Sequence, residues 1–311
     1  MIVLYAAGFT PAARIAAMSS ETQPSAPPNR AGHTRRLRWQ SQFVLLALVP
    51  VTGCWAALLI LSIIGVLGMS WIAWEALAIS TAFATLVFVM RAATAGAAIT
   101  GGIFTCALCL QTPGWHTALW PLLALFVLTH AATRFGRARK EQLGIGEGKR
   151  GRTASQVAAN LGVATVVGIP EVANVLGGFQ VQLVFLVAML AALGEATADT
   201  VSSELGQVLG GEPRLITSFR RVPPGTDGAM SLIGTLSGCL AAAIVIAVGA
   251  LALRVSHAGA LLAFAAAVLG VFLDSFLGAL PERRGWLNND AVNFLSTLAA
   301  ALLATVAVRV V

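Results

Sequence analysis

The feature that most constrains this sequence is a series of continuous apolar runs, many of them long enough to cross a lipid bilayer. A helix needs roughly 18 to 20 apolar residues to span the hydrocarbon core. Only 11% of the 311 residues are charged, against about 25% in soluble domains. A membrane β-barrel would show short segments of alternating polarity instead. The sequence therefore predicts an all-α fold, that of a polytopic helical membrane protein.

About nine transmembrane helices are expected, with boundaries accurate to a few residues. The fifth is short and carries Ser155, Gln156 and Asn160, so it is expected to be tilted, re-entrant or part of a cavity wall. The predicted spans cover residues 43–67, 71–90, 93–111, 116–133, 153–169, 179–199, 229–253, 258–278 and 291–308.

Composition divides the chain into three parts. Residues 1–40 contain several prolines and arginines, which is typical of a disordered, basic cytoplasmic tail. Residues 41–133 are expected to form an N-terminal four-helix membrane region, and residues 134–311 a membrane domain that carries the polar motifs. The opening segment, Met1–Ala17, has no charge before its apolar part and so does not resemble a signal peptide. Met18 is a second possible start.

The distribution of Lys and Arg predicts the orientation of the helices. A cytoplasmic N-terminus and nine spans leave only Arg254 and Arg309, of 20 Lys and Arg residues, outside cytoplasmic segments. The positive-inside rule requires this asymmetry. It also accounts for the net charge of +7, and no nucleic-acid partner is expected because no basic arm carries interleaved aromatic residues. The expected location is a bacterial inner (plasma) membrane, with the polar motifs facing the cytoplasm.

Acidic residues lie at the cytoplasmic end of the sixth predicted span. Glu195 and Asp199 are about one helical turn apart, and Ser203 and Glu204 follow them. Carboxylates at bilayer depth are costly and therefore usually functional. Like charges at this spacing repel unless a divalent cation, a proton or a basic partner relieves them. Mg²⁺ is one candidate, because it prefers carboxylate and phosphate oxygens.

A glycine-rich turn precedes the seventh predicted span, with the sequence Pro-Gly-Thr-Asp-Gly at residues 224–228. Its glycines let backbone N–H groups approach an anion where the next helix begins. Asp227 within it is either a helix cap or a metal ligand. Arg214 and Arg221 precede the turn and suit phosphate oxygens.

Two later polar residues have more than one interpretation. Asp274, inside an apolar span, is either functional or paired with a loop arginine such as Arg283. Asn160, with Gln156 one turn before it, belongs either to a polar seam between helices or to the wall of a ligand site.

These motifs together resemble one integral-membrane family, which includes the plant phytyl-phosphate kinase and the animal transmembrane protein nineteen. The resemblance covers about residues 45–308 and is densest from 152 to 296. The runs that carry it are 156–160, 198–206, 213–217, 224–231 and 273–279.

The resemblance implies a membrane-embedded kinase that transfers a phosphoryl group from a nucleoside triphosphate to an isoprenyl (phytyl-like) monophosphate. CTP is one candidate nucleotide, and Mg²⁺ is the expected cofactor. The residues to which it gives catalytic roles are Asp199, Glu204 and Asp227. Those expected at the metal are Glu195, Asp199, Glu204 and Asp227. Those expected to bind the nucleotide or the lipid substrate are Asn160, Ser203, Arg214, Arg221, Gly225, Thr226, Gly228, Ser231, Asp274 and Asn293.

Two other classes of function stay open. In an ion- or proton-coupled transporter, Glu195, Asp199 and Asp274 would carry the ions or protons. The absence of a visible internal repeat disfavours an inverted-repeat transporter. In a lipid-binding or assembly protein the same site would be degenerate, whereas its acidic positions are all present.

Overall fold

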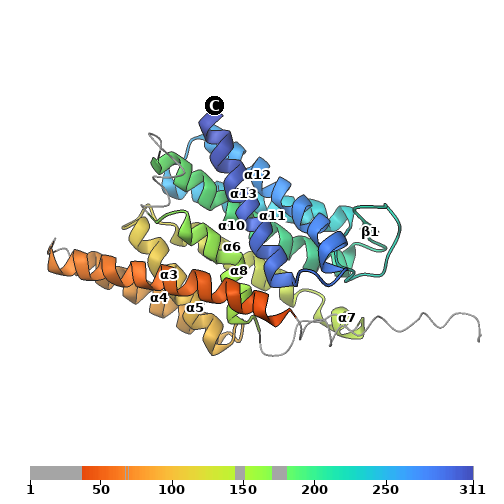
Figure 1. The fold of residues 1–311 in the computed structure, drawn as a ribbon, viewed down its shortest axis with the longest axis horizontal. Coiled ribbons are helices and arrows are strands. Elements are labelled where there is room, and N and C mark those ends of the chain that lie inside the picture. Colours follow the sequence, from red (N-terminus) through yellow and green to blue (C-terminus); the bar gives the residue numbers. More distant parts are fainter. Residues whose placement is uncertain (1–36, 67, 69, 144–150, 170–180, 311) are drawn as a thin grey trace, which may run out of the picture. The chain divides into compact units, whose positions relative to one another are not determined.

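Helices form nearly all of the regular structure in this computed structural model, which describes residues 37–66, 68, 70–143, 151–169 and 181–310 (Figure 1). The one exception among these residues is a short antiparallel hairpin, in which Arg214 pairs with Met230 and Leu215 with Ala229. The elements in chain order are α3 (Arg38–Gly65), α4 (Ser70–Val89), α5 (Ala95–Gln111), α6 (Leu119–Arg134), α7 (Arg137–Gln142), α8 (Ala154–Val166), α10 (Val181–Leu209), β1 (Arg214–Leu215), β2 (Ala229–Met230), α11 (Leu232–Leu253), α12 (His257–Leu277), η2 (Gly278–Glu282) and α13 (Asn289–Val310). The predicted all-α fold class is confirmed.

Each of the nine predicted spans coincides with a helix. In the part of the chain that the structure describes, α3, α4, α10, α11, α12 and α13 are long and apolar enough to cross a membrane. The other three, α5, α6 and α8, have 17, 16 and 13 residues and are shorter than a full span. The protein is a polytopic integral membrane protein, with six full-length candidate spans among the described residues.

The predicted boundary between residues 133 and 134 separates helices that pack closely against each other. Helices of the expected 41–133 region pack on helices of the expected 134–311 domain: α3 and α5 both contact α8, and α6 contacts α10 and α11. The residues from Leu37 onward form one compact unit. Most of the predicted tail, up to residue 36, lies outside the described residues.

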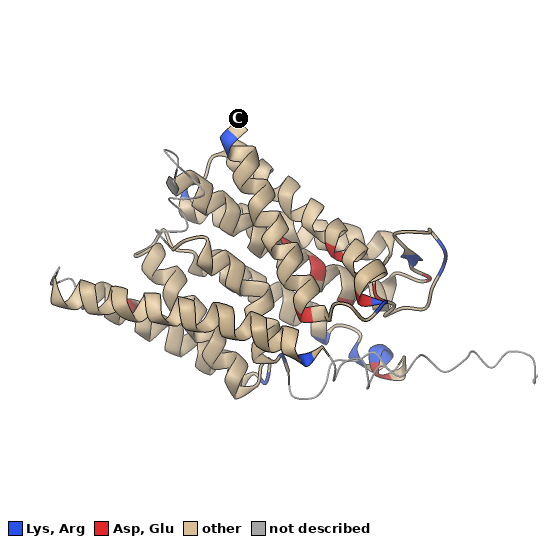
Figure 2. Cartoon of the chain, in the orientation of Figure 1, with Lys and Arg blue, Asp and Glu red and all other residues tan. Residues whose placement is uncertain are grey.

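Helix α10 is the centre of the bundle. It packs against α6, α8, α11, α12 and α13. Its most apolar stretch is 94% buried, against 22% to 44% for the other five candidate spans. The run from Val184 to Leu193 is apolar on every side and buried throughout, and a helix of that kind is stable only in an interior. Glu195 and Glu204, which follow in α10, are therefore buried in the bundle, and Figure 2 shows several Asp and Glu segments among its helices.

Small residues allow α11 to approach α10 closely. A Cβ atom added at Gly238 would lie 2.6 Å from the carbonyl oxygen of Ala198, and one added at Gly234 would lie 2.6 Å from that of Ser202. Membrane helices commonly associate through such small-residue contacts. This packing places the start of α11 beside the acidic part of α10.

A capping box sets the beginning of α8. The hydroxyl of Thr153 accepts a hydrogen bond from the backbone N–H of Gln156, and the Gln156 side chain accepts one from the N–H of Thr153 at 2.8 Å. Two otherwise unpaired backbone donors are satisfied in this way. Gln156 thus serves the helix end, while Asn160, one turn later, is buried in the bundle.

Candidate active site

A polar cavity of about 210 Å³, here called the acidic cavity, lies between α10, the turn at 224–231 and the end of α12. Four carboxylates line it, those of Asp199, Asp227, Asp274 and Glu282, and no Lys or Arg is among the described lining residues. Like charges crowded around one space favour a bound cation or protons. Five more of the predicted site residues line the same cavity: Ser203, Gly225, Thr226, Gly228 and Ser231.

Glycines allow the turn at 224–231 to pack closely against the end of α12. Gly228 has a φ of +72°, and a Cβ atom there would lie 2.2 Å from the backbone nitrogen of Ala279. On the opposite side of the contact, a Cβ atom at Gly278 would lie 2.7 Å from the backbone nitrogen of Gly228. Only glycine combines this backbone conformation with this close approach. The contact brings Asp227 to the cavity that Asp274 also lines.

Two serine hydroxyls of the cavity, those of Ser203 and Ser231, make hydrogen bonds within the helices. Ser231 is the N-cap of α11 and accepts a hydrogen bond from the backbone N–H of Gly234 at 3.1 Å. The Ser203 hydroxyl donates to the carbonyl oxygen of Thr200 at 3.2 Å. Ser231 therefore keeps its proton for a ligand, whereas Ser203 keeps its oxygen lone pairs.

Glu195 lies one helical turn before Asp199 and is 1% exposed. Neither of its carboxylate oxygens makes a hydrogen bond within the described residues. Gly270 of α12 leaves room for this side chain, since a Cβ atom there would lie 2.7 Å from Cγ of Glu195. Nearby, the hydroxyl of Ser296 donates to Asp274 at 3.3 Å. A buried carboxylate is costly unless it is paired or protonated, so Glu195 needs a proton or a cation.

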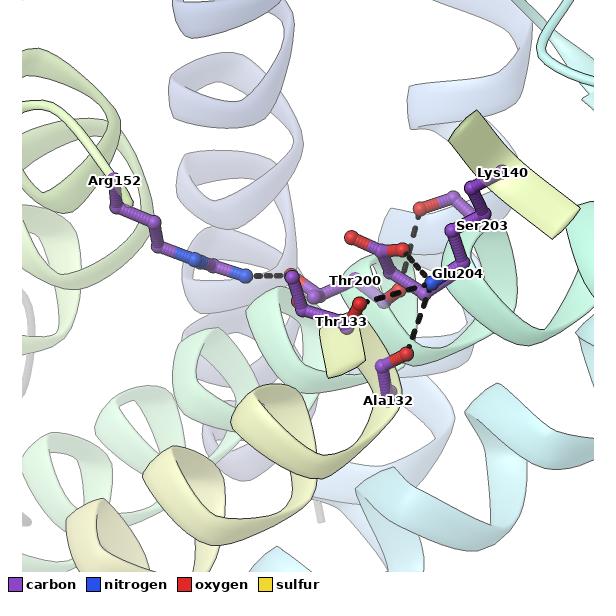
Figure 3. Close-up of polar contacts among 7 residues, drawn as sticks. All are labelled: Ala132, Thr133, Lys140, Arg152, Thr200, Ser203 and Glu204. Atoms are coloured by element: carbon purple, nitrogen blue, oxygen red, sulfur yellow. Dashed lines mark hydrogen bonds and ion pairs between the residues drawn. The ribbon is translucent and has the colours of Figure 1, made fainter. Parts of the chain in front are cut away.

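Glu204, expected at the metal, forms a buried ion pair with Lys140 of α7 instead of lining the acidic cavity (Figure 3). The two side chains are only 10% and 3% exposed. The Lys140 ammonium also donates to the carbonyl oxygens of Ala132 at 3.0 Å and Thr133 at 3.2 Å, at the end of α6. This position gives Glu204 a structural partner, and its metal role stays a prediction.

The predicted phosphate-binding arginines lie on the hairpin and not in the acidic cavity. Arg214 donates to the carbonyl oxygen of Phe219 at 3.2 Å. Arg221 forms an exposed ion pair with Glu212 at 2.8 Å.

The two predicted asparagines meet each other. The side-chain amide of Asn293 in α13 donates to the side-chain oxygen of Asn160 in α8 at 3.1 Å, in a buried contact. Asn160 also lines a second cavity, which lies among α4, α5, α6, α8 and α10. The polar seam expected for Asn160 is therefore present, whereas its place in the wall of a ligand site stays a prediction.

Carboxylate spacing limits how a metal ion could be held. Within the described ranges, no group of three or more His, Cys, Asp or Glu side chains is arranged to hold a metal ion. Mg²⁺ often uses only one or two carboxylates together with phosphate oxygens and water. The carboxylates and hydroxyls of the acidic cavity fit this second kind of site.

Sequence reasoning did not assign several residues of the cavity to the site. Glu282 reaches it because α12 continues into the π-helical turn η2, which contains Pro281. Proline within an apolar run was the available signal that the helix changes there. The other unassigned lining residues with polar side chains are Ser202, Gln207, Thr235, Ser275 and Asn289.

Comparison with known proteins finds one family and several relatives. The model of a family described as integral membrane protein DUF92 matches residues 78–301. The chloroplastic protein VTE6 of Arabidopsis thaliana is 32% identical over 185 residues, which cover 58% of this chain and 55% of VTE6. The chain thus spans about half the length of that relative.

Two microbial relatives are matched over more of their length. An uncharacterized membrane protein of Methanocaldococcus jannaschii is 35% identical over 185 residues, covering 58% of this chain and 72% of that protein. An uncharacterized membrane protein of Synechocystis sp. is 33% identical over 193 residues, covering 61% and 73%. No solved structure matches.

Proposed function

Because this chain belongs to the integral membrane family DUF92, we propose that it is a membrane-embedded kinase acting on an isoprenyl monophosphate. The observation that carries the proposal is the acidic cavity, which is lined from four of the runs that carry the resemblance, 198–206, 213–217, 224–231 and 273–279. The resemblance to the plant phytyl-phosphate kinase supports this chemistry, and so does the similarity to chloroplastic VTE6. CTP is the nucleotide we would test first.

The proposed reaction joins two phosphates. An oxygen of the isoprenyl monophosphate attacks the γ-phosphorus of the nucleoside triphosphate, and the bond from that phosphorus to the β,γ-bridging oxygen breaks. The nucleoside diphosphate leaves with the electron pair, and an isoprenyl diphosphate is formed. The attacking oxygen is already anionic, so catalysis consists of positioning and charge neutralisation.

Residues of the acidic cavity suit these tasks. Asp199 and Asp227 would hold Mg²⁺ directly or through water, and the bound ion would neutralise charge on the polyphosphate. Gly225 and Gly228 let backbone N–H groups of the turn approach phosphate oxygens beside the start of α11. Asp274 and Glu282 would complete the acidic wall of the cavity and would contact the bound ion through ordered water.

One observation favours transport as a second candidate function. Glu195 is buried with both carboxylate oxygens lacking hydrogen bonds in the described structure. Intramembrane carboxylates of this kind mark proton and ion pathways in pumps and transporters. A transporter would move ions across proteoliposomes without consuming nucleotide, which separates it from a kinase.

A substrate screen tests the kinase proposal. Purified protein in detergent with Mg²⁺ is given phytyl, geranylgeranyl or farnesyl monophosphate, each with CTP, ATP, GTP or UTP. At least one combination should yield the isoprenyl diphosphate, and EDTA should stop its formation. If the protein neither binds a nucleotide nor forms a diphosphate, the proposal is wrong.

A further inference from the structure

The second cavity has a composition opposite to that of the first. It measures about 360 Å³ and lies among α4, α5, α6, α8 and α10. No Asp or Glu is among its described lining residues, whereas one group of these residues is cationic: Arg91, Arg134, Arg137, Lys140 and Arg152. Its remaining wall is largely apolar and includes Phe83, Val87, Leu122, Leu125, Phe126 and Leu161. We call it the amphiphilic cavity.

Two arginines of the amphiphilic cavity have more N–H donors than their hydrogen bonds use. Lys140 is paired with Glu204, and Arg137 with Glu141 at 3.0 Å. Arg134 makes a hydrogen bond to the carbonyl oxygen of Met90 at 3.1 Å. Arg152 makes one to the hydroxyl of Thr200 at 3.3 Å (Figure 3). A guanidinium carries five N–H donors, so both arginines can bind an anion without giving up these contacts.

Two buried polar atoms of the cavity also lack partners. Nε2 of His130 and the hydroxyl of Thr133 make no hydrogen bond within the described residues, and both residues line the amphiphilic cavity. The His130 ring stacks on Phe126 with a centroid distance of 5.4 Å. Buried polar atoms normally have a hydrogen-bond partner. Their place in the wall indicates that a ligand with polar oxygens supplies it.

We propose that the amphiphilic cavity binds the isoprenyl monophosphate, an inference that rests on the kinase function proposed above. The phosphate would lie at Arg134 and Arg152, because planar arginine forks match phosphate oxygens. The isoprenyl chain would lie along the apolar wall. Neither a free phosphate nor a neutral isoprenoid would use both parts of such a cavity.

Helix α10 connects this cavity to the acidic one. Ala196 lines the amphiphilic cavity and Asp199 the acidic cavity. Residues three and four apart share one face of a helix, so Ala196, Asp199 and Thr200 are neighbours there. Arg152 contacts Thr200 and is close enough to Asp199 for their charges to interact. A phosphate held by Arg152 would therefore lie next to Asp199, which is assigned to the Mg²⁺ ion of the donor nucleotide.

Acceptor binding without nucleotide tests this assignment. Radiolabelled geranylgeranyl monophosphate is bound to the full-length protein in nanodiscs and then displaced by competitors. Unlabelled geranylgeranyl monophosphate should displace it at a concentration at least about tenfold lower than geranylgeraniol, inorganic phosphate or phosphatidic acid. Equal competition by phosphatidic acid would indicate a general anionic-lipid site, and equal competition by inorganic phosphate a simple phosphate site. Either result would overturn the assignment.

Substitutions of single arginines test where in the protein the acceptor binds. Arg134→Gln and Arg152→Gln should each weaken acceptor binding by about tenfold or more, and Arg134→Lys should restore part of the loss. The matched control is Arg139→Gln, because Arg139 is exposed on α7 and does not line the cavity. Nucleotide affinity should be unchanged in Arg134→Gln, Arg134→Lys and Arg139→Gln, and a single elution peak in detergent shows that all four variants are folded. Acceptor binding equal to wild type in both glutamine variants would contradict the inference.

Turnover separates this inference from the proposed function. If wild-type protein binds the acceptor at the arginines but never forms a diphosphate, the kinase proposal fails and the binding site stands. If diphosphate forms and the KM for the acceptor is the same in Arg134→Gln and Arg152→Gln as in wild type, the kinase proposal stands and the cavity assignment fails.

Discussion

Asp199 and Glu204 lie only five positions apart in one helix, but their carboxylates have different surroundings. Asp199 lines the acidic cavity, with no Lys or Arg among that cavity's described lining residues. Glu204 is neutralised by Lys140 inside the protein. Removing one partner of a buried ion pair destabilises a protein, whereas a carboxylate facing a cavity can bind a cation. The two residues should therefore respond differently to substitution.

Asp199→Asn and Asp227→Asn should each lower the rate of isoprenyl diphosphate formation by about 100-fold or more, because each removes a carboxylate charge that would hold Mg²⁺ on the polyphosphate. Initial rates at saturating substrate measure this, and a single elution peak in detergent shows that folding is intact. Glu212→Gln is the matched control, since Glu212 is exposed and is not among the described lining residues of the cavity. Near-normal rates in both aspartate variants would remove these residues from the metal role.

Glu204→Gln should destabilise the protein by about 3 to 5 kcal/mol, because it leaves the Lys140 ammonium buried without its counter-charge. Equilibrium unfolding in mixed micelles measures the loss. Glu141→Gln breaks the exposed pair with Arg137, whose side chains are 56% and 54% exposed, and should cost less than about 1 kcal/mol. Unchanged stability together with lost activity in Glu204→Gln would instead support the metal role.

The acidic residues of the site could be predicted from the sequence, but the long-range side-chain contacts around them could not. Asp199, Asp227 and Asp274 stand out because carboxylates are rare in apolar runs, and all three line one cavity. Lys140 lies 64 positions before Glu204, and Asn160 lies 133 positions before Asn293. No local pattern specifies such contacts, because they depend on how helices pack. For the same reason Arg134 and Arg152 could not be joined into one cavity.

At the scale of helices, the hydropathy of the sequence predicted which segments are helical. All nine apolar runs are helical because an apolar backbone in lipid must satisfy its hydrogen bonds internally. Helix α7 was not predicted, since its six residues, Arg137–Gln142, are too short and polar to show a periodic pattern. The depth of burial of α10 was not predicted either, because α10 is the least apolar of the six candidate spans in the described part of the chain and only packing decides which helix is central.

Gly238→Val should destabilise the bundle by about 1 to 3 kcal/mol, because the added side chain would overpack the contact of α11 with α10. A Cβ atom there already lies 2.6 Å from a backbone oxygen of α10. Equilibrium unfolding measures the effect, and diphosphate formation should fall with it, since α11 carries Ser231 at the cavity. Gly65→Ala is the control, because nothing lies within 4 Å of a Cβ atom at that helical position. Equal stability of the two variants would show that the close helix contact is not needed.

Charge is unevenly distributed over the whole molecule. Lys and Arg lie mostly at the ends of helices and in connecting segments, whereas several Asp and Glu residues lie along helices within the bundle (Figure 2). Arg134 reaches the carbonyl oxygen of Met90, and the backbone of Arg152 pairs with Ala92. The ends of α4 and α6 and the start of α8 therefore meet at one side. The positive-inside rule predicts that this side is cytoplasmic.

Cysteine labelling tests that orientation. In a background with the four native cysteines replaced by alanine, Arg220→Cys and Trp115→Cys each introduce one exposed thiol. Arg220 lies in the hairpin near the acidic cavity, and Trp115 lies between α5 and α6, on the predicted outer side. A membrane-impermeant maleimide should label Trp115→Cys in intact cells and Arg220→Cys only after permeabilisation. The reverse pattern would place the site outside the cell, where nucleoside triphosphates are scarce, and would contradict both the topology and the kinase proposal.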